Sequence, residues 1–363
     1  MNRTVATSVA LSLAVAVIVG GCTGPSSSPT PPASATPANS GTLTVMTHDS
    51  FALSEETLAS FEAANGVSIE ILRSGDAGSL VNQAVLSKAH PLADVLYGVD
   101  NAFLSRALEA DIFTPYDSPA LADVPAVYQV DARKRVTPID FGDVCLNVDR
   151  TAFAVGTPAA PQTLDDLVKP DYAGRLVVEN PATSSPGLAF LLATIARYGD
   201  TGATTWRDYW AGLRDNDVLV TDGWENAYNG RFSAGPGEGD RQIVVSYASS
   251  PAAEVYFADP QPAEAPTAAV LSGCFRQIEF AGILAGTRKE PGARAFIDFL
   301  LSRPVQEEIP LQMFVYPVRG DAVLPDVFQR FAAVAPDPLT MPFDVIGRNR
   351  DRWIAEWTDI VLH

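Results

Sequence analysis

TLTVMTHDSFALSEETLASFEAANGVSIEILRSGDAGSLVNQAVLSKAHPLADVLYGVD, residues 42–100, alternates short apolar runs with amphipathic stretches. Its apolar runs predict strands, at 43–46, 67–72 and 93–99. Its amphipathic stretches predict helices, one that Ser54 caps and that ends near Gly66, and one at 79–88. Strands that alternate with helices are typical of an α/β domain rather than of a helical bundle or a β-sandwich.

A second set of strands and helices follows the first. It predicts strands at 175–178, 218–220 and 242–247 and helices at 187–198 and 206–213. Two further apolar segments, 136–148 and 274–284, lie before and after this set. If both are strands that return to the first domain, the fold has two α/β lobes joined by two crossover strands, with a ligand cleft between the lobes. The expected boundaries are 42–140 plus 274–363 for the first lobe and 141–273 for the second, with Trp353 and Trp357 on the apolar face of a closing helix.

The N-terminus has the layout of an export signal. Arg3 precedes an apolar run, 9–19, which is too short to cross a bilayer comfortably and ends at Gly20-Gly21-Cys22. Small residues before a cysteine resemble a bacterial lipobox, so we expect residues 1–21 to be a signal peptide and Cys22 to be lipidated, anchoring the chain to the outer face of the cell membrane. A signal peptide cut elsewhere is the alternative.

Residues 22–41 are rich in proline and serine and predict a semi-extended tether, or alternatively a glycosylated stalk. The net charge of the whole chain is −18, which argues against a nucleic-acid partner and favours a cationic ligand. Besides Cys22 only Cys145 and Cys274 remain, and export predicts a disulfide between them, with buried free thiols as the alternative. No His or Cys pair has the spacing of metal ligands, so we expect no metal site.

Several segments, in order along residues 42–360, resemble the thiamine-binding periplasmic proteins of bacterial ABC importers. They are THDSF (47–51), ADVLYGVDN (93–101), PIDFG (138–142), TSSPGL (183–188), DGWENAY (222–228), SYASSPA (246–252) and Tyr316-Pro317. The resemblance implies a two-lobed periplasmic-binding-protein fold of type II and a monomeric receptor that delivers thiamine, or its mono- or diphosphate, to an ABC permease. It implies no catalysis and no cofactor other than this transported ligand.

The resemblance also implies which residues bind the ligand. The matching positions are Asp76, Ala77, Ser184, Ser185, Trp224, Tyr247, Ala248, Ser249 and Ser250. His48 and Phe314 stand where the family has a tyrosine and a tryptophan, and Ala253 replaces another aromatic residue. His48, Asp49 and Phe314 complete the predicted site.

The chemistry of these side chains suits thiamine, which has a flat aminopyrimidine, a cationic thiazolium and a hydroxyethyl arm. Trp224 and Tyr247 offer ring faces, although either could be a core aromatic residue. Asp76 offers a carboxylate, or simply forms a turn, and Asp49 could equally cap the following segment. Ser184-Ser185 and Ser249-Ser250 precede predicted helices, whose N-termini favour anions. We therefore expect phosphorylated thiamine to bind at least as well as thiamine, unless these serines only cap.

Other functions have weaker support. An iron(III) receptor needs clustered tyrosines, and no Tyr-Tyr pair occurs, while a polyamine receptor with carboxylates between aromatic rings remains the nearest alternative. An exported hydrolase needs a nucleophile with a base, and the chain has neither a Gly-x-Ser-x-Gly elbow nor a suitable histidine partner. A surface adhesin would have repeats or a broad apolar patch, and the sequence shows neither.

Overall fold

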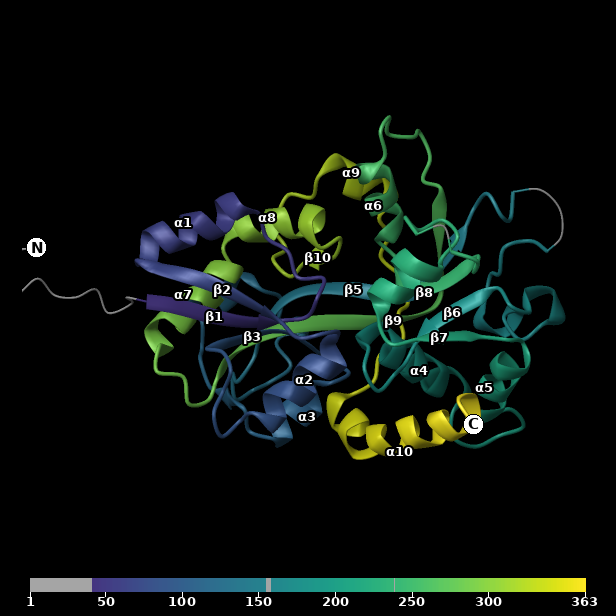
Figure 1. The fold of residues 1–363 in the computed structure, drawn as a ribbon, viewed down its shortest axis with the longest axis horizontal. Helices are drawn as coiled ribbons and strands as arrows, with labels where there is room; N and C mark the ends of the chain where they lie inside the picture. Colours follow the sequence, from purple (N-terminus) through teal and green to yellow (C-terminus); the bar gives the residue numbers. More distant parts are fainter. Residues whose placement is uncertain (1–40, 155–157, 238) are drawn as a thin grey trace, which may run out of the picture. The chain divides into compact units, whose positions relative to one another are not determined.

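The computed structural model describes residues 41–154, 158–237 and 239–363, and their centre is one mixed β-sheet (Figure 1). The strand order is β2-β1-β3-β9-β5-β8-β6-β7, with β4 paired to β9 and β10 paired to β5. The strands are β1 (Gly41–Thr47), β2 (Val67–Arg73), β3 (Val95–Asp100), β4 (Phe113–Thr114), β5 (Thr137–Asp149), β6 (Leu176–Glu179), β7 (Leu219–Thr221), β8 (Ile243–Tyr247), β9 (Thr267–Leu284) and β10 (Tyr316–Pro317).

Helices cover both faces of this sheet (Figure 1). The α-helices are α1 (Glu55–Asn65), α2 (Ala77–Leu86), α3 (Leu104–Glu109), α4 (Ser185–Tyr198), α5 (Trp206–Asp215), α6 (Ser250–Phe257), α7 (Glu290–Leu300), α8 (Arg303–Gln312), α9 (Asp326–Phe331) and α10 (Phe343–Val361). Short 3-10 segments and one π-helical segment, Asn226–Arg231, join them. In the part of the chain that the structure describes, no helix is long and apolar enough to span a membrane.

The first lobe forms largely as the sequence predicts. Ser54 caps α1, and its hydroxyl accepts a hydrogen bond from the Thr57 amide at 3.1 Å. The helix predicted at 79–88 begins two residues earlier, at Ala77, because the Asp76 carboxylate accepts a hydrogen bond from the Ala77 amide at 2.7 Å. Asp76, for which a turn was one expected role, is thus the N-cap of α2.

Two long strands join the halves of the sheet. β5 and β9 pair antiparallel with each other. On its other edge, β5 pairs with β8, and on its other edge, β9 pairs with β3. β9 begins at Thr267, seven residues before the predicted 274, because it continues its pairing with β5 to Asp149. The predicted two-lobed α/β fold with two crossover strands is confirmed, whereas the lobe boundaries stay a prediction.

The sheet has a hydrophobic core on each face, and successive residues of a strand alternate between the two cores. In β1, Leu43 and Val45 join the core beneath α1, α7 and α8, and Met46 joins the core beneath α2, α3, α4, α5 and α10. This second core runs along both lobes. On that face of the sheet, apolar side chains therefore pack continuously against the crossover strands.

The C-terminal helix α10 contacts helices from both proposed lobes, α3 and α5. Trp353 and Trp357 are buried as predicted, and Trp357 meets Trp210 of α5 edge to face, with ring centroids 5.5 Å apart. On the other side, the Arg350 guanidinium lies 5.9 Å from the Phe103 ring, just before α3. Residues 343–361 therefore bridge the two lobes along one side of the sheet.

A disulfide joins Cys145 of β5 to Cys274 of β9, as the sequence predicts. The two cysteines are 129 residues apart in sequence and both are buried. The bridge therefore links the two crossover strands covalently between the lobes.

Candidate functional site

A cavity of about 890 Å³ lies at the carboxyl ends of parallel strands, where open α/β sheets bind their ligands. The loops after β1, β2, β6 and β8 line it. The middle of the sheet contributes through β5 and β9, and the α8–β10 connection closes another side. The cavity is therefore formed jointly by the two lobes and the crossover strands.

Trp224 presents an aromatic face in the cavity wall. Its indole N–H donates a hydrogen bond to the Ser246 hydroxyl at 2.8 Å, and its ring stacks on Tyr228 with centroids 5.1 Å apart and an interplanar angle of 18°. The side chain is half-buried and lines the cavity. Because Tyr228 covers one face of the indole, a ligand in the cavity can stack on the other.

Tyr247 lies at the end of β8 and is the second aromatic residue predicted for the site. Its ring packs over Gly142 so closely that a Cβ at that position would lie 2.8 Å from the Tyr247 ring. Its hydroxyl donates a hydrogen bond to Gln277 Oε1 at 3.3 Å. The absence of a side chain at residue 142 thus allows the tyrosine ring to approach the crossover strand closely.

Asp76 links three segments of the cavity wall. One carboxylate oxygen accepts hydrogen bonds from the Ala77 amide at 2.7 Å and from the Ser185 amide at 3.5 Å. The other accepts from the Trp224 amide at 3.1 Å. Asp76 therefore holds the starts of α2 and α4 and the Trp224 turn together across the cleft, and its carboxylate lies within the cavity lining.

Negative charge dominates the cavity. Seven lining residues carry carboxyl groups: Asp49, Asp76, Asp140, Asp222, Glu225, Glu254 and Glu279. No lysine or arginine is among the lining residues of the described chain. A cavity with this lining concentrates cations and disfavours anions.

Burial changes the protonation of the deepest groups. It raises the pKa of Asp140 well above its ordinary value, and the neighbouring Glu279 raises it further. For His48, burial alone would lower the pKa, but the adjacent Glu279 carboxylate, with Asp76 and Asp49, raises it above its ordinary 6.5. The imidazole is therefore favoured as a hydrogen-bond donor inside the cavity.

Nine of the twelve predicted ligand-binding residues line the cavity: Asp76, Ala77, Ser185, Trp224, Tyr247, Ser250, His48, Asp49 and Phe314. The structure does not place the other three there. Ser184 is fully buried and its hydroxyl has no hydrogen-bond partner among the described residues. Ala248 packs beside the disulfide, and the Ser249 hydroxyl donates a hydrogen bond to the Phe314 carbonyl at 2.5 Å. All three are buried within the protein instead.

The sequence interpretation missed the acidic groups on the crossover strands. Asp140 lies between Ile139 and Phe141 in β5, and Glu279 lies between Ile278 and Phe280 in β9. A carboxylate within an apolar strand is a usable signal, because charged side chains are seldom buried without a specific role. That signal was available in the sequence for both residues.

Phe257, an exposed aromatic residue at the cavity, was also missed. Phe257 at the end of α6 is 72% exposed, lines the cavity, and lies 5.3 Å from Phe314 and 5.2 Å from Tyr256 between ring centroids. Phe314 has φ +53°, a left-handed conformation that is costly for a bulky residue. These rings give one side of the cavity an apolar surface.

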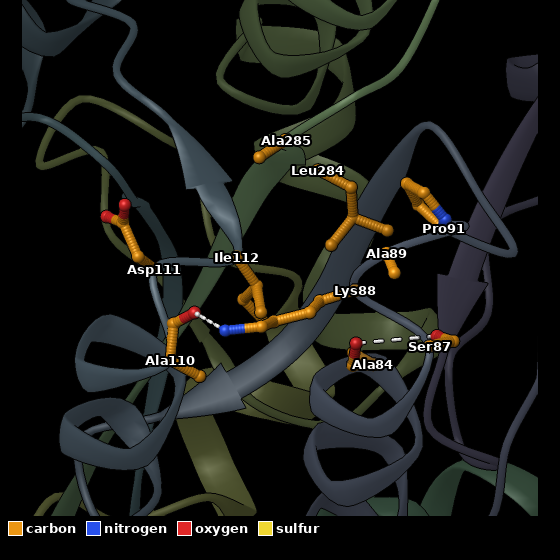
Figure 2. A pocket seen from close by; sticks show the side chains of 10 residues that line it. All are labelled: Ala84, Ser87, Lys88, Ala89, Pro91, Ala110, Asp111, Ile112, Leu284 and Ala285. Carbon is orange, nitrogen blue, oxygen red and sulfur yellow. Dashed lines mark hydrogen bonds between the residues drawn. The ribbon is translucent and has the colours of Figure 1, made fainter.

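A second, smaller cavity of about 290 Å³ lies away from this site, between the ends of α2, α3 and β9 (Figure 2). Its lining is mostly alanine, leucine, isoleucine and proline, and the Lys88 amine reaches across it to donate a hydrogen bond to the Ala110 carbonyl at 3.3 Å. None of the predicted ligand-binding residues lines it. Among the described residues no group of His, Cys, Asp or Glu is placed to hold a metal ion.

The fold and the cavity define a solute-binding protein of the two-lobed, type II class. Residues 90–347 match the model of the family of bacterial extracellular solute-binding proteins, and the chain belongs to that family. It is therefore a binding protein that acts outside the cytoplasm, in a family that is not enzymatic.

The relatives within this family include thiamine-binding proteins. The thiamine-binding periplasmic protein of Escherichia coli strain K12 is 30% identical over 320 residues, which cover 87% of this chain and 92% of that protein. The protein of the same name from Brucella suis is 28% identical, with 87% and 91% coverage. A solved periplasmic thiamin binding protein is 28% identical, with a TM-score of 0.76 and 88% and 96% coverage.

Proposed function

We propose that this protein captures thiamine, or its mono- or diphosphate, outside the cytoplasm as a monomer and delivers it to an ABC importer. The observation that carries the proposal is the cavity itself, which combines aromatic faces with seven carboxyl groups and without a lining lysine or arginine among the described residues. The similarity to thiamine-binding relatives over most of the chain supports the same ligand.

The cavity supplies the contacts that each part of thiamine requires. Trp224 and Tyr247 offer ring faces to a flat or cationic ring, and cation–π contact favours the thiazolium. The carboxylate of Asp76 adds electrostatic attraction near the indole, since it accepts a hydrogen bond from the Trp224 amide. We propose that the two lobes, 42–140 with 274–363 and 141–273, close on the ligand through the crossover strands.

The phosphate forms belong to the proposal because two helices begin at the cavity. Ser185 and Ser250 are the first residues of α4 and α6, and both line it. Their hydroxyls have partners within the protein, Asp100 for Ser185 and Ser246 for Ser250. A phosphate would therefore meet mainly backbone amides at these helix starts.

The proposal is tested by purifying the protein without its first 40 residues and titrating it calorimetrically. We expect a 1:1 complex with thiamine and a Kd below about 1 µM, which corresponds to a binding free energy of about 8 kcal/mol or more. Native mass spectrometry should also show thiamine, or a thiamine phosphate, carried through purification. The absence of any heat with thiamine at 100 µM would reject the ligand.

The same titration settles the phosphate forms. We expect thiamine monophosphate to bind at least as well as thiamine if the helix starts meet the ester. A Kd for the ester more than tenfold weaker than that for thiamine would instead mean that the acidic lining excludes phosphate, and would remove these forms from the proposal.

A polyamine is the second candidate ligand, because carboxylates line the cavity between aromatic side chains. Spermidine should not displace thiamine at equal concentration if the proposal is correct. Iron(III) fits less well, since the hydroxyls of the lining tyrosines Tyr228 and Tyr247 are directed to Glu254 and Gln277 rather than to a common point. A colourless protein after incubation with ferric citrate would agree.

We further propose that a lipid on Cys22 anchors the protein, with residues 22–41 as the tether. These residues lie outside the described part of the chain, and the support is the sequence Gly20-Gly21-Cys22 after an apolar run. In a bacterial host we expect the full-length chain in the membrane fraction and the Cys22→Ser chain in the soluble exported fraction. Equal distribution of the two chains would remove the anchor from the proposal.

A further inference from the structure

A histidine and a carboxylate lie side by side in the part of the cavity formed by the sheet. His48 follows β1 and Glu279 lies within β9, 231 residues further along the chain. The His48 Nε2 is 3.3 Å from each of the two Glu279 carboxylate oxygens. Both side chains line the cavity and are largely buried, with 14% and 10% of their surface exposed. The imidazole Nε2–H is therefore placed to donate to the Glu279 carboxylate and to fix that carboxylate at the cavity wall.

The backbone around this pair is shaped to place it there. Gly98 in β3 has φ +104°, and a Cβ at that position would lie 2.3 Å from the His48 ring, so no other residue leaves room for the imidazole. The pairing of β3 with β9 shifts register between Tyr97 and Val99, at this glycine. Such bulges redirect side chains and are frequent beside binding sites.

Glu279 destabilises the folded sheet, because its neighbours on both adjacent strands also carry carboxyl groups. In the sheet it is paired with Asp100 of β3 on one side and with Asp140 of β5 on the other, so three carboxyl groups occupy neighbouring positions on adjacent strands. Like charges directly opposite each other destabilise a sheet. The Tyr97 hydroxyl donates a hydrogen bond to Asp140, and the Ser185 hydroxyl donates to Asp100, so these two carboxyls are held by the protein.

Glu279 differs from these two carboxyls in its surroundings. Besides His48 and the two acidic neighbours, the titratable groups recorded beside it are Tyr97 and Tyr247. None of them is a lysine or arginine. Its carboxylate lines the cavity and is paired with the imidazole of His48, an arrangement that a ligand with a hydrogen-bond donor can use.

We propose that Glu279 and His48 form the recognition edge for the aminopyrimidine of the ligand. The Glu279 carboxylate accepts a hydrogen bond from the exocyclic amino group, and the His48 Nε2–H donates to that carboxylate and holds it in position. The inference rests on the proposed function and adds to it the residues that select the heterocycle. Asp100 and Asp140 lie opposite Glu279 on the neighbouring strands, one on each side.

This edge makes the cavity selective for the hydrogen-bonding pattern of the heterocycle. An analogue in which a ring carbonyl replaces the amino group, such as oxythiamine, presents an acceptor and an N–H where thiamine presents a donor and an acceptor. It would place its oxygen against the Glu279 carboxylate, leaving a buried acceptor unpaired. Sites that hydrogen-bond a substrate group reject such analogues far more strongly than apolar pockets do.

The test compares thiamine with oxythiamine by calorimetry in the wild-type protein, Glu279→Gln and Glu254→Gln. The wild type should prefer thiamine by about 100-fold, since a mismatched buried hydrogen-bond pair costs at least this ratio. Glu279→Gln should reduce the preference at least tenfold, because a carboxamide can donate to the oxygen of the analogue. Glu254→Gln, which also lines the cavity but accepts its hydrogen bond from Tyr228, is the matched control and should keep the wild-type preference.

The outcomes separate the two proposals. If the wild type binds no thiamine, the proposed function is wrong. If it binds thiamine but Glu279→Gln keeps the wild-type preference, the recognition edge is wrong and the function stands. Glu279→Gln removes one carboxyl group from three neighbouring ones, and we expect this variant to fold. If thermal denaturation shows that it does not, His48→Phe replaces it in the test. His48→Phe must then weaken the binding of thiamine about tenfold and leave the binding of a thiazolium fragment unchanged.

Discussion

Replacing Cys145 and Cys274 together by alanine is expected to lower the free energy of unfolding by about 3 to 5 kcal/mol. The disulfide closes a long loop, with 129 residues separating its ends, so in the chain-entropy model the cross-link removes much of the freedom of the unfolded chain. Both positions are buried, and alanine leaves no unpaired polar group there. Urea denaturation followed by circular dichroism measures the change.

The wild-type protein under reducing conditions provides the control for this experiment. It should lose a similar amount of stability, because it lacks the cross-link but keeps the side-chain volume of both cysteines. Alkylation before reduction, followed by mass analysis, checks the premise: two labelled thiols in the unreduced chain would refute the bridge. Equal unfolding midpoints for the oxidised and reduced wild type would show that the bridge does not stabilise the fold.

Trp224→Ala is expected to weaken thiamine binding by about three- to thirtyfold, from the roughly 0.5 to 2 kcal/mol that a cation–π contact supplies in a desolvated cleft. The indole is stacked on Tyr228 and fixed by its hydrogen bond to Ser246, so it is positioned before the ligand arrives. Thiamine should therefore quench the emission of this indole on binding. A fluorescence titration measures both the affinity and the quench.

The other tryptophans serve as internal controls. Trp206, Trp210, Trp353 and Trp357 are all buried in the core, away from the cavity lining, so their emission should not respond to the ligand. Trp224→Phe retains an aromatic face and should bind with near-normal affinity but without the quench. An unchanged quench in Trp224→Phe would place the ligand beside another tryptophan and exclude Trp224 from the site.

Much of the fold could be predicted from periodicity and from capping residues. The helix predicted at 187–198 begins at Ser185, and the strand predicted at 242–247 begins at Ile243, because local apolar patterns and caps control where these elements form. The start of β9 was missed by seven residues. Its first residues, from Thr267, become a strand only through pairing with β5, which is a long-range interaction that no local pattern records.

The candidate site was predictable where it depended on loops at strand ends, and less so elsewhere. The sequence predicts the same ligand-binding role for Ser184 and Ser185, but only Ser185 lines the cavity. Adjacent side chains at the start of a helix such as α4 point in different directions. Phe257 could not be assigned at all. Its place at the cavity depends on how α6 packs beside the α8–β10 connection, where Phe314 meets it.

The sequence by itself determined the alternation of strands and helices, the only available pair of core cysteines and the excess of negative charge. These are properties of composition and of local order, which the unfolded chain already carries. Only the tertiary structure decided that His48 and Glu279 meet, because their contact depends on the order of β1, β3 and β9 in the sheet and on a register shift at Gly98. A shift of one residue turns every later side chain of a strand to the opposite face, so the pairing of distant strands, rather than the identity of the residues, brings this donor and acceptor together.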